Sequence, residues 1–553
     1  MVVLGISGRY RDAAAAVVVN GEIAAAAAEE SFVRVPRIGY EHTDGFPYFA
    51  VDACLRRADV TVDDIDAVAA VDESPCGDGN DGGTALMSLA GALDREACHG
   101  ELRQRLRQRP FHRVHPLVAD AQQVAAASPF TDSIVLALSS ESGGGAAFLS
   151  RDGRLDCLET IDETGSLVEA ARQIAMGLGC RLSAPFDGLQ QLARFGEPEF
   201  ASCFAEAIGY RNNGLMVDHT NVAEILRRTA NGTSLSDNGH LTIAVQTRRR
   251  ALAASFQHRI SDVVCQTVDR LRARTGIQAV GLGGGLFADC DMTSRLRDAL
   301  GDAVYVAAVP EAVGRAIGGA LASVQSVQGS RPPIRNLRFG PAYSEDQVKE
   351  ALDNCRLDYV YEPRWDRILL RASRLLARGS TVAWFQGPME FGPRPFNSRS
   401  ILCDPSNRYA AENINRFVKQ RSEDHALAIS MSDVAAAECL GAAFESRFVA
   451  LRAVVREEYR DRVRAVLDRK HAVLVHTVHQ AEAPEFWQLL ELHRQATGVP
   501  GLMNVPLSAP NEPVACTPRD AIRTTFSCAI DALVLGRFLL MKDYWLLRSD
   551  ADR

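Results

Sequence analysis

Two stretches far apart in the chain repeat one pattern of apolar runs and tight turns, and this repeat limits the folds open to the chain. Residues 2–29 contain an apolar strand, a polar loop, and two further strands joined by an Asn20-Gly21 turn. Residues 134–160 follow the same plan, with a glycine-rich loop and an Asp152-Gly153 turn. Asn-Gly and Asp-Gly pairs between apolar runs are strong hairpin signals. The sequence therefore predicts an internal duplication.

Beyond these hairpins, predicted helices and strands alternate, which is typical of α/β proteins. Apolar residues recur at helical spacing over 250–274, and a strand within 279–287 runs into a glycine turn. After residue 343 the pattern predicts helices near 345–355 and 365–378, followed by a buried strand at 381–386. The fold class predicted for the whole chain is therefore α/β.

The length of the chain calls for more than one domain. At 553 residues with 47% apolar content, the chain can build at least two hydrophobic cores. Residues 325–342 are polar and contain a Pro-Pro step, which favours a domain boundary. We predict a first domain over residues 1–330 and a second over residues 343–553.

The composition limits partners and location. The net charge is −8 and no basic run stands out, so nothing favours nucleic acid as a partner. The thirteen cysteines include no Cys-x-x-Cys pair, which favours reduced thiols over a disulfide framework. The first residues lack the pattern of a secretory leader, and no apolar run reaches membrane-spanning length. We expect a cytoplasmic protein that acts on small molecules and does not contact a membrane.

The stretch from Trp384 to Leu402, WFQGPMEFGPRPFNSRSIL, sets two arginines, a serine and several glycines beside the predicted buried strand. A guanidinium offers a rigid fork of N–H donors that suits a phosphate or carboxylate. Arg394 and Arg399 are therefore candidate anion-binding residues, and Gly387 and Gly392 would let backbone amides approach a ligand. On composition alone, a surface loop with two solvated arginines explains the segment about equally well.

The same stretch resembles the signature of the O-carbamoyltransferase family, whose members carbamoylate antibiotics and nodulation factors. The family form is close to F-x-G-R-M-E-F/W-G-P-R-A-L-G-N-R-S-I-L. The matching positions are Gly387, Met389, Glu390, Phe391, Gly392, Pro393, Arg394, Arg399, Ser400, Ile401 and Leu402. Pro388 replaces the first arginine of the family form, and residues 395–398 replace A-L-G-N. Landmarks from GISGRYRDAAAAVV near the start to DALVLGRFLL near the end extend the resemblance over essentially the whole chain.

The resemblance implies an N-terminal actin-like (Kae1-like) domain of two ribonuclease-H-type halves and a C-terminal YrdC-like α/β domain. In the family, carbamoyl phosphate and ATP form carbamoyl adenylate in the second domain. The first domain then transfers the carbamoyl group to a hydroxyl. The family's anion-binding or nucleotide-binding positions are held here by Arg394, Arg399, Ser400, Lys419, Arg421 and Asn504.

The second domain also departs from the family pattern. After Arg421, where the family continues E-x-F/W-R-P-F-A-P, the changed positions hold Ser422, His425, Ala426 and Ile429. After Asn504 the family's T-S-F-N is also replaced. We therefore expect an anion pocket with a degenerate carbamoyl phosphate motif, and ATP is a candidate cofactor.

In the first domain the resemblance implies a metal site, most of whose positions are changed. Asp12 survives from the family's F-x-H-D, but Arg11 replaces the histidine. In the H-H-x-x-H-A motif, Phe111 replaces the first histidine and His115 keeps the last. The regions of two carboxylate ligands hold Ser139 and either Ala312 or Val313. A metal needs about three protein ligands, so we expect it to be absent or weakly bound.

The candidate catalytic residues of the first domain are Asp12, Arg11, His115 and Asp289. Arg11 could replace some of the charge stabilisation of a lost cation, although simple decay of an ancestral site explains the change as well. Asp289 stands where the family has asparagine, and is a candidate base or nucleotide contact.

Two further groups have both a functional and a structural explanation. Gly283, Gly284 and Gly285 form a turn that can cradle adenosine or its phosphates, but close packing is the commoner reason for such a cluster. The histidines that could supply a general base are His425, His471, His476 and His479. Lone histidines in α/β domains are more often solvated or structural.

Three functions follow from these observations. The first is transfer of an ATP-linked carbamoyl or related acyl group to a hydroxyl or amine of a small specialised metabolite, in a bacterial biosynthetic route such as antibiotic production. The second keeps the fold but catalyses another ligation, condensation or rearrangement. The third is a catalytically silent binding partner, and association with a second copy or a partner enzyme stays open. No G-x-S-x-G, H-E-x-x-H or P-loop motif supports another enzyme class.

Overall fold

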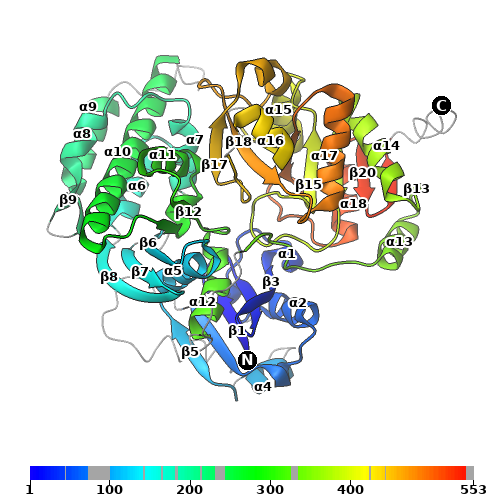
Figure 1. Ribbon diagram of the computed structural model, residues 1–553, viewed down its shortest axis with the longest axis horizontal. Coiled ribbons are helices and arrows are strands. Elements are labelled where there is room, and N and C mark those ends of the chain that lie inside the picture. The colour runs from blue at the N-terminus through cyan, green and yellow to red at the C-terminus, as the bar shows by residue number, and fades with distance from the viewer. Residues whose placement is uncertain are drawn as a thin grey trace. The chain divides into compact units, whose positions relative to one another are not determined.

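The computed structural model describes most of the chain (Figure 1). The described residues are 1–43, 45–71, 100–106, 108–140, 144–162, 166–180, 185–211, 214–230, 243–324, 334–422, 425–441 and 444–542. The chain forms two compact units. The first comprises Met1–Gly8, Val18–Glu22 and Ile65–Ile334, and the second comprises Arg9–Val17, Ile23–Asp64 and Arg335–Arg553.

The first sheet contains the first predicted hairpin. Its strand order is β3-β2-β1-β4-β5. The strands are β1 (Val2–Ser7), β2 (Ala14–Val19), β3 (Glu22–Ala28), β4 (Ala67–Val71) and β5 (Phe111–Val114). β1 runs parallel to β4, and β4 parallel to β5. Asn20 and Gly21 have φ values of 51° and 87°, the positive angles that a type I′ hairpin turn needs.

The second sheet repeats this arrangement in the order β12-β11-β6-β7-β8. Its strands are β6 (Asp132–Leu138), β7 (Gly145–Arg151), β8 (Arg154–Asp162), β11 (Val280–Gly283) and β12 (Val304–Val306). The β7–β8 turn has φ values of 48° at Asp152 and 76° at Gly153. Because the two sheets have equivalent strand orders, the predicted duplication is confirmed. Part of the glycine-rich loop before β7, residues 141–143, lies outside the described residues.

Two helices of the first unit, α5 (Pro116–Ala127) and α12 (Arg315–Ser323), pack closely against each other. A Cβ added at Gly318 would lie 1.9 Å from the carbonyl oxygen of Ala119 in α5. A Cβ added at Gly5 in β1 would lie 2.1 Å from the carbonyl oxygen of Ala316. Glycine at these two positions lets α12 contact both α5 and β1 at backbone distance.

The remaining elements of the first 330 residues are mainly helices, and the predicted helix at 250–274 is confirmed within α10. They are α1 (Glu30–Val33), α2 (Tyr48–Ala58), α4 (Gly100–Leu106), α6 (Ser166–Gly177), α7 (Pro185–Ala193), α8 (Ala201–Ala207), β9 (Ile208–Arg211), β10 (Gly214–Val217), α9 (His219–Ala230), α10 (Ile243–Thr275) and α11 (Cys290–Leu300). Short 3₁₀ turns are η1 (Tyr40–His42), η2 (Val62–Asp64), η3 (Gly285–Ala288) and η4 (Ala312–Gly314).

The C-terminal part is built on a nine-stranded sheet in the order β13-β21-β20-β14-β15-β19-β16-β18-β17. Its strands are β13 (Val360–Tyr361), β14 (Val382–Phe385), β15 (Arg399–Cys403), β16 (Ala428–Ser432), β17 (Leu451–Val454), β18 (Ala472–Val478), β19 (Leu502–Pro506), β20 (Ala532–Leu535) and β21 (Phe538–Met541). The parallel pairs are β14–β20 and β16–β18, while β15 is antiparallel to both neighbours. The sheet is therefore mixed.

Helices cover both faces of this sheet. One core contains Ile401 with residues of α13, α16 and α18, and the other contains Leu402 with residues of α14 and α17. The helices are α13 (Glu345–Asn354), α14 (Trp365–Ala377), α15 (Ala410–Asn413), α16 (Asp433–Leu440), α17 (Pro484–Thr497) and α18 (Pro518–Ser527), with the π turn η5 (Ile414–Val418) and the 3₁₀ turn η6 (Glu457–Val463). We call these the Ile401 face and the Leu402 face.

These observations confirm the predicted α/β class, with a duplicated N-terminal part of the actin-like type and a C-terminal α/β part. The boundaries 1–330 and 343–553 stay predictions, and residues 325–333 of the predicted linker lie outside the described residues. In the described ranges, each cysteine is a free thiol. No helix within those ranges is both long and apolar enough to cross a membrane.

Substitution of Gly318 by alanine tests the α5–α12 contact. The new methyl group would meet the rigid carbonyl of Ala119, and overpacking of this kind costs about 1–3 kcal/mol. We expect Gly318→Ala to lower the melting temperature by about 4 °C in calorimetry. The control is Gly177→Ala, where the added Cβ meets only side-chain atoms of Leu226, at 3.3 Å and beyond. Equal melting temperatures for the two variants would contradict the close approach of α5 and α12.

Candidate functional site

The motif loop between β14 and β15 is organised by the buried carboxylate of Glu390. Its Oε1 accepts the backbone N–H of Asn397 at 2.7 Å and that of Arg399 at 3.3 Å, and it also accepts the N–H of Ser398. Gly387 and Gly392 have φ values of 53° and 110°, which favour glycine in this loop. Glu390 thus fixes the backbone from which the Arg399 side chain starts.

Arg399 is buried, and the described residues satisfy one edge of its guanidinium. Nη1 donates to the carbonyls of Gln386, Gly387 and Ser398 at 3.0, 3.1 and 3.2 Å. The guanidinium carbon lies 3.5 Å from the centre of the Phe385 ring. Nε and Nη2 have no hydrogen-bond partner among the described residues. These two atoms form the side-on fork that binds an oxyanion in bidentate fashion.

The charge of Arg399 is incompletely compensated. Burial lowers the pKa of Arg399 to about 10, with a partly opposing effect from the Glu390 carboxylate. Burial likewise raises the pKa of the neighbouring Cys516 thiol to about 11, so that it stays neutral near pH 7. A buried cation with unpaired donors is costly, and an anionic ligand would remove that cost.

Arg394 is placed differently, although it belongs to the same motif. Its Nη1 donates to the carbonyl oxygens of Phe448 and Val449, both at 3.0 Å. These contacts hold a loop about 50 residues further along the chain. The structure therefore gives Arg394 a role in loop positioning, and its predicted role in anion binding stays a prediction.

Lys419 is buried on the Ile401 face and is surrounded by oxygen atoms. Its Nζ donates to the carbonyls of Pro506 at 2.6 Å and Ser508 at 2.8 Å, and to Oγ of Ser508 at 3.0 Å. Burial, with a contribution from the charge of Arg421, lowers the pKa of Lys419 to about 7. Three acceptors oppose this shift because they use all three protons of an ammonium group. Lys419 thus anchors the turn after β19.

Arg421, Ser400 and Asn504 do not join Arg399 in one cluster. Nε of Arg421 donates to Oδ1 of Asn415 at 2.8 Å, and burial lowers the pKa of Arg421 to about 10. Ser400 and Asn504 alternate in their strands with residues of the Ile401 core, so they belong to the Leu402 face. The predicted donor set is therefore divided between the two faces of the sheet.

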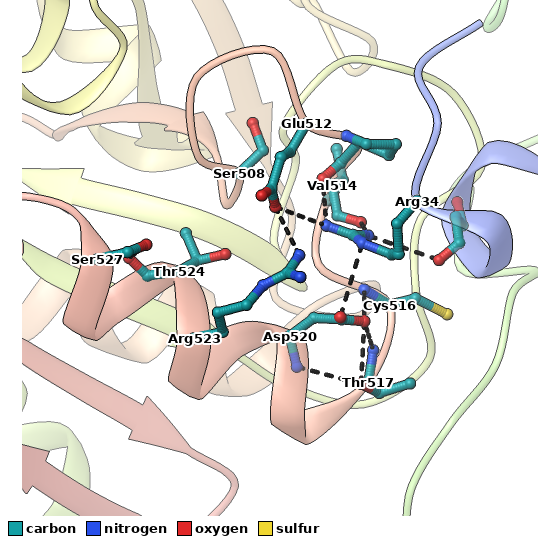
Figure 2. Close-up of polar contacts among 12 residues, drawn as sticks. Arg34, Ser508, Glu512, Val514, Cys516, Thr517, Asp520, Arg523, Thr524 and Ser527 are labelled. Carbon is teal, nitrogen blue, oxygen red and sulfur yellow. Dashed lines mark hydrogen bonds and ion pairs between the residues drawn. The ribbon is translucent and has the colours of Figure 1, made fainter. Parts of the chain in front are cut away.

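The loop that follows β19 is held by an arginine that the sequence did not single out (Figure 2). Nη1 and Nη2 of Arg34 donate to the carbonyls of Val514 and Pro513 at 2.7 and 2.8 Å. Nε of Arg34 lies 3.6 Å from Oδ1 of Asp520, which forms a capping box with Thr517 at the start of α18. Figure 2 shows the Arg34 fork inside this loop. The loop includes Cys516, the thiol that lies near Arg399.

Asp12 and Arg11 lie in a cluster of opposite charges near the start of the chain. Nε and Nη2 of Arg37 donate to Oδ1 and Oδ2 of Asp12 at 3.2 and 3.3 Å. Nε of Arg11 lies 3.5 Å from Oδ2 of Asp12. The carboxylate is thus bracketed by two guanidiniums, of which Arg37 was missed because no motif marks it. The catalytic roles of Asp12 and Arg11 stay predictions.

His115 begins helix α5 and is already used there. As the N-cap residue, it accepts the N–H of Leu117 through Nδ1 at 3.2 Å. The implied ligand positions at Phe111 and Ala312 carry no donor atom. Among the described residues, no group of three or more His, Cys, Asp or Glu side chains could hold a metal ion.

A buried ion pair lies close to the remaining donors. Nε of Arg315 lies 3.1 Å from Oδ1 of Asp120, and both side chains are almost fully buried. Nη2 of Arg315 donates to Oγ of Ser139 at 3.4 Å. The carboxylate of Asp120 and the hydroxyl of Ser139 thus contact the permanent positive charge of Arg315. The residues present do not fit the metal that the resemblance implies.

The glycine turn of the first unit is tightly packed. Added Cβ atoms would lie 2.7 Å from the carbonyl oxygen of Asp120 at Gly283, 2.4 Å from that of Leu138 at Gly284, and 2.1 Å from Ser140 Oγ at Gly285. Close packing therefore accounts for these glycines, and nucleotide contact by them stays a prediction.

Asp289 follows this turn and caps α11. Its Oδ1 accepts the N–H groups of Asp291 and Met292 at 2.9 and 3.1 Å, and its Oδ2 accepts from Gln257. Burial, with the nearby charge of Asp291, raises the pKa of Asp289 to about 7. Asp289 borders a pocket that holds about 410 Å³ of space, part of it open to solvent. The pocket is lined by Phe186, Leu189, Gln190, Phe256, Gln257, Ile260, Gly285, Leu286, Ala288, Asp289 and Met292.

The candidate histidines have different surroundings. His471 is exposed. Nδ1 of His479 lies 3.5 Å from Oδ2 of Asp433, and its Nε2 lies 3.3 Å from Oε1 of Glu445. The carbonyl oxygen of His425 accepts from Nδ2 of Asn415 at 2.9 Å. His476 is buried and lines a cavity on the Leu402 face. Of the four, only His476 combines burial with access to a cavity.

Comparison with known proteins identifies the family. The model for the carbamoyltransferase N-terminus matches residues 174–321, and that for the carbamoyltransferase C-terminus matches residues 373–542. The chain is 25% identical over 566 residues to nodulation protein NolNO of Sinorhizobium fredii, covering 96% of this chain and 79% of the relative.

Two further likenesses cover smaller parts of the chain. The 3'-hydroxymethylcephem-O-carbamoyltransferase of Streptomyces clavuligerus is 28% identical over 236 residues, which cover 41% of this chain and 42% of that enzyme. The full-length HypF structure is 13% identical with a TM-score of 0.39, covering 60% of this chain and 56% of that chain. The family models and the near full-length relative together show that this chain belongs to the carbamoyltransferase family.

Proposed function

We propose that the protein transfers a carbamoyl group, or a closely related acyl group, from an acyl phosphate to a hydroxyl or amine of a small specialised metabolite. Family membership supports carbamoyl transfer in general. The observation that carries the donor assignment is the buried Arg399 fork, whose Nε and Nη2 have no partner within the described ranges. Carbamoyl phosphate offers oxyanions that would pair with this fork.

Surrounding residues support an acyl phosphate at the fork. The Phe385 ring stacks on the guanidinium and keeps its plane fixed. The loop that includes Cys516 is held by Arg34, so the environment of the fork is preorganised. The charge on Arg399 would stabilise negative charge that develops on the phosphate as the acyl group leaves.

We propose that the pocket beside Asp289 binds the adenine of a nucleotide. Its apolar wall includes Phe186 and Phe256, which suit a base, and the Gln190 and Gln257 carboxamides could read its polar edge. This proposal rests on the chemistry of the residues that line the pocket. The acceptor would belong to a biosynthetic route comparable to that of the cephem relative, whose name states O-carbamoylation.

A second candidate keeps the fold but omits the metal-dependent step. The ion pair of Asp120 and Arg315 supports it, because a guanidinium lies beside the oxygens that remain in the implied metal region. On this account the protein would catalyse a metal-independent ligation, condensation or rearrangement. A silent binding partner would bind neither ATP nor an acyl phosphate.

Carbamoyl phosphate binding tests the donor assignment. We expect Arg399→Met to weaken the affinity about 100-fold in titration calorimetry, because two charge-assisted hydrogen bonds of about 1.5 kcal/mol each are lost. The exposed Arg416→Met, in the same domain, is the matched control and should bind like wild type. Equal affinity in Arg399→Met would refute the assignment. If ATP alone binds wild type, the second candidate is favoured, and if neither ligand binds, the silent partner is.

The titration of Asp289 can be followed through stability. Because the folded pKa of about 7 lies above the ordinary value of 3.8, this group's contribution to stability is lost as pH rises from about 4 to 7. Asparagine caps a helix as well as aspartate does but does not titrate. We expect the melting temperature of Asp289→Asn, relative to wild type, to be higher at pH 8 than at pH 5. The same difference at both pH values would remove the basis for a neutral-pH base at Asp289.

A further inference from the structure

A lysine and a serine of the C-terminal domain form a pair that the proposed function does not use. Nζ of Lys419 lies 3.0 Å from Oγ of Ser508. The two residues come from segments that are distant in sequence, the end of the π turn η5 and the loop after β19. Each is only 9% exposed, so water has little access to the pair. A serine hydroxyl at hydrogen-bond distance from a buried amine is the arrangement of a Ser-Lys nucleophile and base.

The backbone around Lys419 has an uncommon geometry that fixes the position of the amine. Residues 414–418 form a π turn, and the N–H of Lys419 donates to the carbonyl oxygen of Ile414 at 2.8 Å. Gln420 follows with a φ value of 47°, a left-handed conformation that is strained for a residue other than glycine. Both features are frequent at functional sites. The fold thus keeps a strained local geometry that presents Lys419 to the loop after β19.

The loop that begins with Ser508 is held at both ends. The N–H of Leu507 donates to the carbonyl oxygen of Arg399 at 2.9 Å, and the N–H of Ala515 donates to the carbonyl oxygen of Leu507 at 2.7 Å. Arg34 binds carbonyl oxygens near the far end of the same loop (Figure 2). The hydroxyl of Ser508 therefore meets Nζ of Lys419 from a fixed backbone, and such preorganisation favours attack on a bound molecule.

The contacts of Lys419 fit a neutral amine as well as an ammonium group. Nζ also lies 2.6 and 2.8 Å from the carbonyl oxygens of Pro506 and Ser508. A neutral amine has two N–H groups for these two carbonyls, and its lone pair then accepts the hydroxyl proton of Ser508. In the part of the chain that the structure describes, the contacts of Lys419 include no carboxylate that would hold the ammonium form. Because burial lowers the pKa of Lys419 to about 7, the neutral amine is populated near pH 7.

Arg421 adds a permanent positive charge near this pair. The charge of Arg421 acts on Lys419 and disfavours its ammonium form. Nε of Arg421 donates to Oδ1 of Asn415 at 2.8 Å, which holds the guanidinium in place. Attack of a hydroxyl on a carbonyl group places negative charge on the carbonyl oxygen, and a fixed guanidinium stabilises that charge. The three residues thus combine a nucleophile, a base and a group that can stabilise an oxyanion.

We propose that Ser508 is a nucleophile, activated by Lys419, that accepts the acyl group of a small activated acyl compound, either an acyl phosphate or an ester with a good leaving group. Oγ of Ser508 forms a bond to the carbonyl carbon while its proton moves to Nζ of Lys419. The bond from that carbon to the leaving oxygen then breaks, the leaving group departs with the electron pair, and Nζ returns the proton to it or to water. Attack by water or an alcohol, whose proton passes through Nζ to Oγ of Ser508, releases the acyl group.

This reactivity goes beyond the transfer proposed above. It does not depend on recognition of phosphate by Arg399, because any activated small acyl compound supplies the electrophilic carbon. The family motif N-T-S-F-N ends in asparagine at the position of Ser508, and an amide is not a nucleophile of this kind. The pair is therefore a feature of this chain.

Acylation of the full-length protein by carbamoyl phosphate and by p-nitrophenyl acetate tests the pair. Intact mass and peptide mapping locate the acyl group, and release of p-nitrophenolate gives the rate. We expect wild type to gain one acyl group on Ser508, and Ser508→Ala to lose it with a fall in rate of about 100-fold or more. The matched control is Ser527→Ala, at an exposed serine of the same domain whose Oγ donates to the carbonyl oxygen of Thr524. This control should react like wild type.

Lys419→Arg separates a base from a structural anchor. An arginine can still donate to the carbonyl oxygens of the turn, but it keeps its proton near pH 7. We expect this variant to fold and to be acylated about 100-fold more slowly than wild type. In wild type, the rate should rise as the pH increases through about 7 and then level, because the neutral amine is the active form.

The two probes keep this proposal distinct from the donor assignment. Acylation of Ser508 by p-nitrophenyl acetate alone supports the Ser508–Lys419 pair and counts against carbamoyl phosphate as the donor. If Ser508→Ala proves unstable, peptide mapping of wild type and the rate of Lys419→Arg decide. Absence of an acyl group on Ser508 with both probes, or equal rates in wild type and Lys419→Arg, would overturn the proposal.

Discussion

The guanidinium of Arg399 is the group on which the account of the C-terminal domain depends. Three carbonyl oxygens and an aromatic ring hold it, yet in the part of the chain that the structure describes its Nε and Nη2 meet no acceptor. Folding leaves such a group unpaired only at a cost, and binding of an anion recovers that cost. The loop that carries it is held by Glu390 at one point and by Arg394 at another. These contacts make the fork a rigid site.

In the first unit, the fold likewise holds a buried arginine, Arg315, in place. Arg315 pairs with Asp120 at the contact of α5 with α12, where Gly318 lets the two helices meet at backbone distance. A buried pair of this kind specifies how the two helices lie against each other, and removal of either partner would leave a buried charge. In the implied metal region, Arg315 donates to Ser139 and His115 caps α5. Among the described residues, too few ligand atoms are therefore grouped there to hold a metal ion.

Much of the fold could be predicted because its signals are local. The Asn20-Gly21 and Asp152-Gly153 turns have the positive φ angles that their sequences favour, and both hairpins lie in sheets of equivalent order. The anion-binding character of the motif was also predictable. Which arginine would be buried was not, because Arg394 is satisfied by carbonyls about 50 residues away while Arg399 is not. The difference between the two arginines depends on contacts with residues that are distant in sequence.

Other parts of the site carried no sequence signal at all. Arg34 reaches a carbonyl 480 residues further along the chain, and no pattern around it suggests that contact. The division between Arg399 and Ser400 could have been anticipated, because neighbouring residues of a strand point to opposite faces. The hydrogen bonds that join Ser430 to His476 and to Asn504 could not be anticipated, since these residues lie on three strands that are separated in sequence.

A crystal structure of the protein with carbamoyl phosphate would show whether the Arg399 fork binds the donor. We expect one oxygen of the ligand within about 2.7–3.2 Å of Nε and another at a similar distance from Nη2 of Arg399, with Nη1 still bound to its carbonyls. Carbamoyl phosphate bound elsewhere, with no ligand oxygen at the Arg399 fork, would refute this role of Arg399.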